Sequence, residues 1–387
     1  MKKILYTLLL FSTISISAQG KRFFENGEVQ LKNPVEKINL RFESNLPFVK
    51  VSINGKIYNF LFDSGAPTVI SHAIYDELEL KKKYKRSVKD SNEKTQEQIF
   101  TELPEMLVDN LTFKKVGAIV LDLNSAELGC LKVDGILGAN QMAKLFWRVN
   151  YTENSLEATR DLTLFDLKDY KTILPFDPKP QKTPVVKTRL FDKEIDLTFD
   201  TGFSGRIEVT EEKFNIKKTS RAVETYGTRS IGAFGAAKPV KGYIFRVDSM
   251  KLGNTIFQNE LISTSASDLI GNEFTKDFSF ILDWKNNKVY FKPIKTIAPK
   301  LETFGFSYRF IDAKPVVAFV FQEENFPLKI GDSIISINNI NLENLNKDSA
   351  CQYMINRIEK NQSNIDIKIK RDGKILDFKM ERKEYLK

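Results

Sequence analysis

One short loop motif occurs twice in this chain, and each copy stands between two stretches rich in β-forming residues. Both copies have the pattern Asp-[Ser/Thr]-Gly, formed by Asp63, Ser64 and Gly65 and again by Asp200, Thr201 and Gly202. Glycine at the third position lets the backbone turn where a Cβ atom would clash. A single Asp-Ser-Gly is usually an ordinary turn in which the aspartate caps its own backbone, so the duplication is the informative feature.

A second pair of motifs follows the first at matching distances. Residues 133–140 (VDGILGAN) correspond to residues 267–273 (SDLIGNE), and both continue through a short helical pattern into a strand-like stretch. Gly138 lies 75 residues after the first aspartate, and Gly271 lies 71 residues after the second. Self-similarity of this kind predicts two equivalent β-rich lobes.

The sequence divides naturally around these repeats. We expect the lobes at residues 35–166 and 185–295, joined by the proline-containing residues 167–184. The region at 302–382 does not repeat the motifs and is expected to be a separate α+β domain. Its predicted elements are a strand at 315–321, a helix at 347–360 and a hairpin within 365–378 around an Asp-Gly turn.

The first residues have the pattern of a secretory signal. A basic start is followed by about 14 apolar or small residues, and small residues stand near positions 17–19. This run is shorter than the roughly 20 residues that a membrane span needs. We therefore expect a signal peptide at 1–18, and an exported protein, periplasmic or secreted, with no membrane span after signal removal.

Histidine and cysteine are scarce: the 387 residues include one His and two Cys. A zinc site needs three or four ligands that usually include several such residues, so we expect no metal and no cofactor. The two cysteines, Cys130 and Cys351, are 221 positions apart, and we expect two buried free thiols. The net charge of +9 is spread out, and its densest run, residues 81–86, belongs to no recognisable nucleic-acid-binding module. We expect no nucleic-acid partner.

The duplicated loops suggest a specific chemistry. If the lobes pack about a pseudo-two-fold axis, the loops meet there and Asp63 faces Asp200. Two carboxylates about 3 Å apart cannot both ionise at ordinary pH, so they share one proton. The ionised member can take a proton from a water, while the protonated member hydrogen-bonds the carbonyl under attack. We expect the hydroxyls of Ser64 and Thr201 to bond across to the opposite loop's backbone.

Two other hydrolytic arrangements fit parts of the sequence. Residues 202–206 (GFSGR) approach a nucleophile elbow, but the last glycine is missing and the base would have to be His72, which we expect on the surface. A glycosidase also uses two carboxylates, which stand ~5–9.5 Å apart. Tight glycine turns favour closer contact than that.

These motifs resemble the aspartic protease family, in its retropepsin-like branch, over roughly residues 40–295. The resemblance implies a bilobal pepsin/retropepsin-like fold, a monomer whose lobes form an intramolecular pseudo-dimer, catalysis by Asp63 and Asp200, and polypeptide substrates. It also implies flap hairpins, for which the candidates are residues 89–100 and 230–237. Ala66 and Phe203 stand where acid-acting relatives often carry a hydroxyl, so we expect activity closer to neutral pH.

The C-terminal region resembles a PDZ domain. Phe304, Gly305 and Phe306 resemble the loop whose backbone amides hold a peptide carboxylate, and Thr303 stands where glycine is frequent in that family. The resemblance implies peptide or substrate binding at this loop. The alternative is an inactive protease-like scaffold that binds peptides through its PDZ-like domain. The sequence leaves substrate identity and cleavage preference open.

Overall fold

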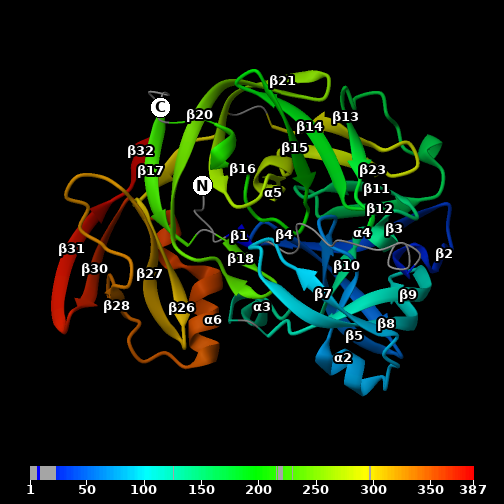
Figure 1. Cartoon of the computed structure of the whole chain (residues 1–387), viewed down its shortest axis with the longest axis horizontal. Helices are drawn as coiled ribbons and strands as arrows, with labels where there is room; N and C mark the ends of the chain where they lie inside the picture. The colour runs from blue at the N-terminus through cyan, green and yellow to red at the C-terminus, as the bar shows by residue number, and fades with distance from the viewer. Residues whose placement is uncertain are drawn as a thin grey trace.

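The computed structural model describes residues 7–8, 23–124, 126–214, 216, 221–228, 230–295 and 298–387. Within these ranges the chain is mainly β, with a few short helices (Figure 1), which confirms that part of the fold prediction. The expected signal segment lies outside the described residues except for β1 (Thr7–Leu8), which pairs with β18 (Ser230–Gly232). In the same ranges no helix combines the length and apolar character that crossing a bilayer requires.

The first half of the chain places its central strand β5 between two partners. Its elements are β2 (Glu28–Gln30), β3 (Val35–Glu43), β4 (Leu46–Ile53), β5 (Lys56–Asp63), β6 (Val69–Ser71), α2 (His72–Glu77), β7 (Tyr84–Lys89), β8 (Thr95–Val108), β9 (Leu111–Leu121), α3 (Ala126–Cys130), β10 (Gly135–Gly138), α4 (Ala139–Met142), β11 (Phe146–Asn150) and β12 (Ser155–Thr159). β5 pairs antiparallel with β4 and parallel with β10, and every residue from Tyr58 to Asp63 is buried. Burial on both faces explains why this strand reads as a nearly continuous apolar run.

The second half repeats this pairing scheme. Its elements are β13 (Thr172–Pro178), β14 (Pro184–Leu190), β15 (Lys193–Phe199), β16 (Ile207–Thr210), β17 (Ala222–Gly227), β18, β19 (Gly235–Ala236), β20 (Val240–Leu252), β21 (Thr255–Ser265), β22 (Leu269–Ile270), α5 (Asn272–Thr275), β23 (Phe278–Asp283) and β24 (Lys288–Pro293). β22 lies parallel to β15 and antiparallel to β16, as β10 does with β5 and β6. Likewise β16 runs parallel to β21, as β6 does to β9.

The two halves share one sheet and one core. β11 pairs antiparallel with β23, with Trp147 opposite Leu282, and this joins the halves through their equivalent strands. One apolar cluster runs through both halves and contains Phe62 and Trp147 from the first and Phe199 and Phe280 from the second. This shared core fixes the position of one half against the other.

The C-terminal part is an α+β unit with its own apolar cluster. Its elements are β25 (Leu301–Thr303), β26 (Phe306–Ile311), β27 (Lys314–Phe321), β28 (Ser333–Ile337), β29 (Ile340–Asn341), α6 (Lys347–Asn356), β30 (Asn364–Arg371), β31 (Lys374–Glu381) and β32 (Lys383–Tyr385). The expected strand is β27, and the expected hairpin is β30–β31, which turns at Asp372 and Gly373, both with positive φ. The expected helix is shorter than predicted, because Arg357 leaves helical geometry at φ 22°.

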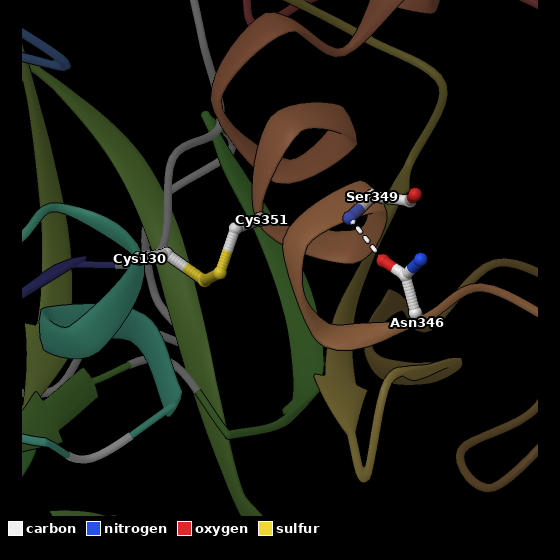
Figure 2. Close-up of a disulfide and its surroundings, with 4 residues drawn as sticks. All are labelled: Cys130, Asn346, Ser349 and Cys351. Atoms are coloured by element: carbon white, nitrogen blue, oxygen red, sulfur yellow. Dashed lines mark hydrogen bonds between the residues drawn. A yellow bond between two sulfur atoms is a disulfide. The ribbon is translucent and has the colours of Figure 1, made fainter.

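The two cysteines form a disulfide, so the expectation of free thiols is wrong (Figure 2). Cys130 is the last residue of α3 in the first half, and Cys351 lies in α6 of the C-terminal part. Folding brings α3 and α6 side by side, and the two Cα atoms are 4.9 Å apart, a normal separation for a disulfide. Distance along the sequence is therefore no guide to this pairing.

Candidate active site

The duplicated loops leave equivalent strands and meet in the interior. Asp63 ends β5, where Gly138 of β10 lies opposite it, and Asp200 directly follows β15. Both aspartates are buried. Strand pairing inside each half thus fixes the position of each aspartate at the end of its strand.

The hydroxyls of the two loops bind each other's backbone. Thr201 Oγ1 accepts the N–H of Ser64 at 2.9 Å, and Ser64 Oγ accepts the N–H of Thr201 at 3.0 Å. Each hydroxyl also donates to the carbonyl just before the opposite aspartate, at Phe199 (2.7 Å) and Phe62 (2.8 Å). These four reciprocal bonds hold the two loops in register.

The glycine of each loop makes room for the aspartate of the other. A Cβ atom on Gly65 would overlap the carboxyl group of Asp200, and a Cβ atom on Gly202 would overlap that of Asp63. No residue with a side chain fits at either position without moving the opposite carboxyl. The two carboxyl groups therefore face each other across the pair of glycines.

Each carboxyl group is held by one of its oxygens. Oδ1 of Asp63 accepts the N–H groups of Gly65 (2.7 Å) and Ala66 (3.1 Å), and Oδ1 of Asp200 accepts that of Gly202 (2.8 Å). Oδ2 of each aspartate is buried without a protein donor. Each carboxyl group lies close enough to the other to shift its pKa.

Burial makes ionisation of this pair unfavourable. It raises the pKa of Asp63 well above its ordinary value, and the neighbouring Asp200 raises it further. Burial also raises the pKa of Asp200 to about 7, against the opposing effects of the bond with Asp63, the Gly202 N–H and the charge of Lys179. Because the groups are coupled, the two protonation steps belong to the pair rather than to either residue. Both shifts favour retention of a proton by the pair.

A buried network of hydrogen bonds holds the second aspartate loop at Thr201. Asn272, directly after Gly271, donates from Nδ2 to the carbonyl of Thr201 at 2.6 Å and to that of Asn45 at 2.9 Å. Its Oδ1 accepts the hydroxyl of Tyr151 at 2.9 Å. Sequence reasoning did not single out Asn272 or Tyr151, although Asn272 belongs to the repeated second motif.

The two segments proposed as flaps lie against each other. We call β18–β19 the lid hairpin and residues 90–94, between β7 and β8, the latch turn. Asp90 Oδ2 accepts the N–H of Phe234 at 2.9 Å, and Lys94 Nζ donates to the carbonyls of Phe234 (3.2 Å) and Ala236 (2.8 Å). Asn92 Nδ2 donates to the carbonyl of Gly235 at 3.0 Å. These bonds join the two halves at a second place, apart from the aspartate loops.

The remaining sequence-derived residues lie elsewhere. His72 is exposed at the start of α2 and lines a cavity of about 460 Å³ beside the lid hairpin, whereas Ser204 is buried. Phe304 and Phe306 are buried in the apolar cluster of the C-terminal part, and Gly305 has φ 79°. In the described part of the chain no cluster of His, Cys, Asp and Glu is arranged to hold a metal ion.

Comparison with known proteins bears on the first loop. Residues 49–141 match the family model described as aspartyl protease, and this segment runs from β4 through the Asp63 loop and the Gly138 motif to α4. The match supports an aspartyl protease family. No curated protein matches the chain.

Proposed function

We propose that this protein is an aspartic endopeptidase whose Asp63 and Asp200 activate a water molecule to hydrolyse peptide bonds. One observation carries the proposal: two buried carboxyl groups from duplicated loops face each other, and each has an oxygen without a protein donor. Those oxygens are where a water and a substrate carbonyl would bind. The family match over the first loop agrees with this chemistry.

The proposed reaction follows from the single proton of the pair. The ionised carboxylate takes a proton from the water, and the water oxygen attacks the carbon of the peptide carbonyl. At the same time the protonated carboxyl donates its proton to the carbonyl oxygen. The carboxyl group that took the water proton then passes it to the amide nitrogen, and the C–N bond breaks. The other carboxylate takes back a proton from a hydroxyl of the tetrahedral species, which restores the starting state of the pair. The donors on each Oδ1 orient the carboxyl groups before substrate arrives, so little reorganisation is needed. Neither aspartate is assigned separately as acid or base, because the proton is shared.

We also propose the bilobal pepsin/retropepsin-like fold for residues 35–166 and 185–295, since both halves repeat one pairing scheme around equivalent loops. Residues 302–382 are proposed to be a PDZ-like domain. The N–H of Gly305 is bonded to Thr303 Oγ1 at 3.1 Å, and its carbonyl accepts the N–H of Phe321 at 2.7 Å. An occupied amide is a poor receptor for a carboxylate, so packing against the protease halves is the role we favour for this domain. Export rests on the pattern at 1–18.

Digestion of a peptide library with the purified protein from pH 3 to 8 tests the proposal. We expect cleavage that is abolished in Asp63→Asn and in Asp200→Asn, and retained in the control Asp248→Asn, which changes an exposed aspartate paired with Arg221. A hydroxyl isostere that mimics the tetrahedral species is expected to inhibit. Unchanged turnover in both active-site variants would refute the mechanism. No cleavage by the wild type would favour the inactive scaffold.

A further inference from the structure

The lid hairpin shares an apolar cluster with residues that follow the first aspartate loop. Ile231 and Ala233 are buried in an apolar cluster that also contains Ala66 and Val69, the residues that follow the first aspartate loop. Ala66 also donates its N–H to Asp63, which places one residue of this cluster beside the carboxyl pair. Both aspartates are buried, so a neighbouring segment has to move before an extended polypeptide can reach them, and this hairpin is one of the segments packed there.

The C-terminal part holds the base of this hairpin. β27 pairs antiparallel with β17, with Thr225 opposite Phe321 and Gly227 opposite Phe319. The N–H of Thr228, next along the chain, donates to the carbonyl of Ala318 at 2.7 Å. β18 begins two residues later. Backbone bonds to the C-terminal part therefore anchor the strand from which the hairpin emerges.

The disulfide lies beside the apolar cluster in which the same hairpin is buried. Leu128 of α3 and Leu131, one residue beyond its end, belong to the apolar cluster that buries Ile231, and Ile355 of α6 packs against that cluster. Cys130 lies between these two leucines and is bonded to Cys351 of α6 (Figure 2). The covalent bond thus ties α6 to the wall against which the lid hairpin packs.

We propose that the C-terminal part is a clamp on the lid hairpin, and that the Cys130–Cys351 disulfide sets how readily the hairpin leaves the aspartate pair. Strand pairing fixes the C-terminal part to the second half, and the disulfide fixes it to the first half, so the two attachments span the hairpin. When a dithiol reductant cuts the bond, two electrons and two protons pass to the two sulfur atoms and the dithiol becomes a disulfide. The α3 segment is then free to move away from α6, and the hairpin loses one of its walls.

The expected effect on peptide cleavage rests on the proposed function, whereas the expected release of the hairpin does not. Hydrogen exchange at the N–H of Phe234 reports release of the hairpin directly, because this group donates across to Asp90. We expect this amide to exchange about tenfold faster after reduction of the folded protein, while amides of β23 in the shared core keep their protection. The same result is expected for the double variant Cys130→Ser/Cys351→Ser, and core protection verifies that it folds.

A matched control variant distinguishes the effect of the disulfide on exchange from the effect of a less stable α6. Asn346 caps α6 by accepting the N–H of Ser349 at 2.8 Å (Figure 2), so Asn346→Ala weakens the helix while leaving the disulfide intact. We expect no acceleration of Phe234 exchange in this variant. In a peptidase assay, reduction is expected to raise kcat/KM for a long polypeptide about threefold or more, and less for a short peptide.

Equal exchange at Phe234 in the oxidised and reduced proteins would overturn the clamp, and so would acceleration of the same size in Asn346→Ala. Faster exchange without peptide cleavage in either redox state would leave the clamp standing and count against the proposed peptidase. A fall in kcat/KM on reduction, with β23 still protected, would overturn the claim that the clamp restricts access.

Discussion

The N–H of Ser64 and the hydroxyl of Thr201 are 2.9 Å apart, and the reverse bond, from the N–H of Thr201 to the hydroxyl of Ser64, is 3.0 Å. Two residues that are 137 positions apart in the sequence thus bind each other's backbone N–H groups, next to the two aspartates. Several consequences of this site can be measured.

Replacing Thr201 with valine removes the acceptor for the Ser64 N–H while keeping the side-chain volume. A buried donor left unpaired costs about 1–3 kcal/mol, so we expect the free energy of unfolding to fall by about that amount. Urea denaturation measures the loss, and peptidase turnover should fall with it because the loops lose their register. Thr201→Ser keeps the hydroxyl and is the control; equal stability of both variants with wild type would contradict this role.

Alanine at Gly65 places a Cβ atom on the carboxyl group of Asp200. We expect this overpacking to destabilise the fold by about 1–3 kcal/mol and to abolish turnover. The double variant Gly65→Ala/Asp200→Ala relieves the overlap, so the cost of alanine at position 65 should be smaller in the Asp200→Ala background. Equal costs in the two backgrounds would mean that the carboxyl group is not where the structure has it.

The raised pKa of the pair makes folding stability depend on pH in a defined direction. Because burial favours the protonated carboxyl, the folded state binds more protons than the unfolded state once the pH exceeds the ordinary aspartate pKa. This contribution to stability is therefore complete at low pH and is lost as the pH rises toward about 7. Thermal unfolding of Asp200→Asn should show a weaker loss between pH 4 and 7 than wild type. A parallel pH dependence in the two proteins would contradict the assignment.

The same pKa shift predicts activity near neutral pH. Turnover requires the pair to lose its first proton, so the acidic limb of the pH–rate profile should lie near pH 7. Lys179 lowers the pKa of Asp200, and Lys179→Met should move this limb to higher pH. Lys182→Met is the control, since that lysine lies in the same turn but pairs with Glu25. A rate maximum below about pH 3.5 would contradict the prediction.

The two Asp-[Ser/Thr]-Gly loops and the motifs that follow them could be recognised in the sequence because they are local patterns. β5 and β15 each lead into an Asp-[Ser/Thr]-Gly loop, and Gly138 and Gly271 follow the aspartates at similar spacings of 75 and 71 residues, in the strands that pair beside them or directly after those strands. The prediction that the hydroxyls of Ser64 and Thr201 bond across to the opposite loop follows from the same duplication.

Features that depend on contacts between non-equivalent segments could not be predicted, because they leave no repeated motif in the sequence. The disulfide depends on α6 packing beside α3, and nothing near Cys130 or Cys351 in the sequence indicates this. The latch bonds of Asp90 and Lys94 arise where a turn of one half meets a hairpin of the other. Lys179 belongs to a segment that reads only as a linker, and its effect on Asp200 requires the folded positions of both.

The pairing of β17 with β27 has a practical consequence for work with pieces of this protein. β17 is paired with β20 on its other side, so removing the C-terminal part would uncover the edge of β17 at residues 225–227. Bare strand edges invite pairing between molecules. A truncated fragment that retained both aspartates would therefore be expected to self-associate in solution, and its poor behaviour would say nothing about catalysis.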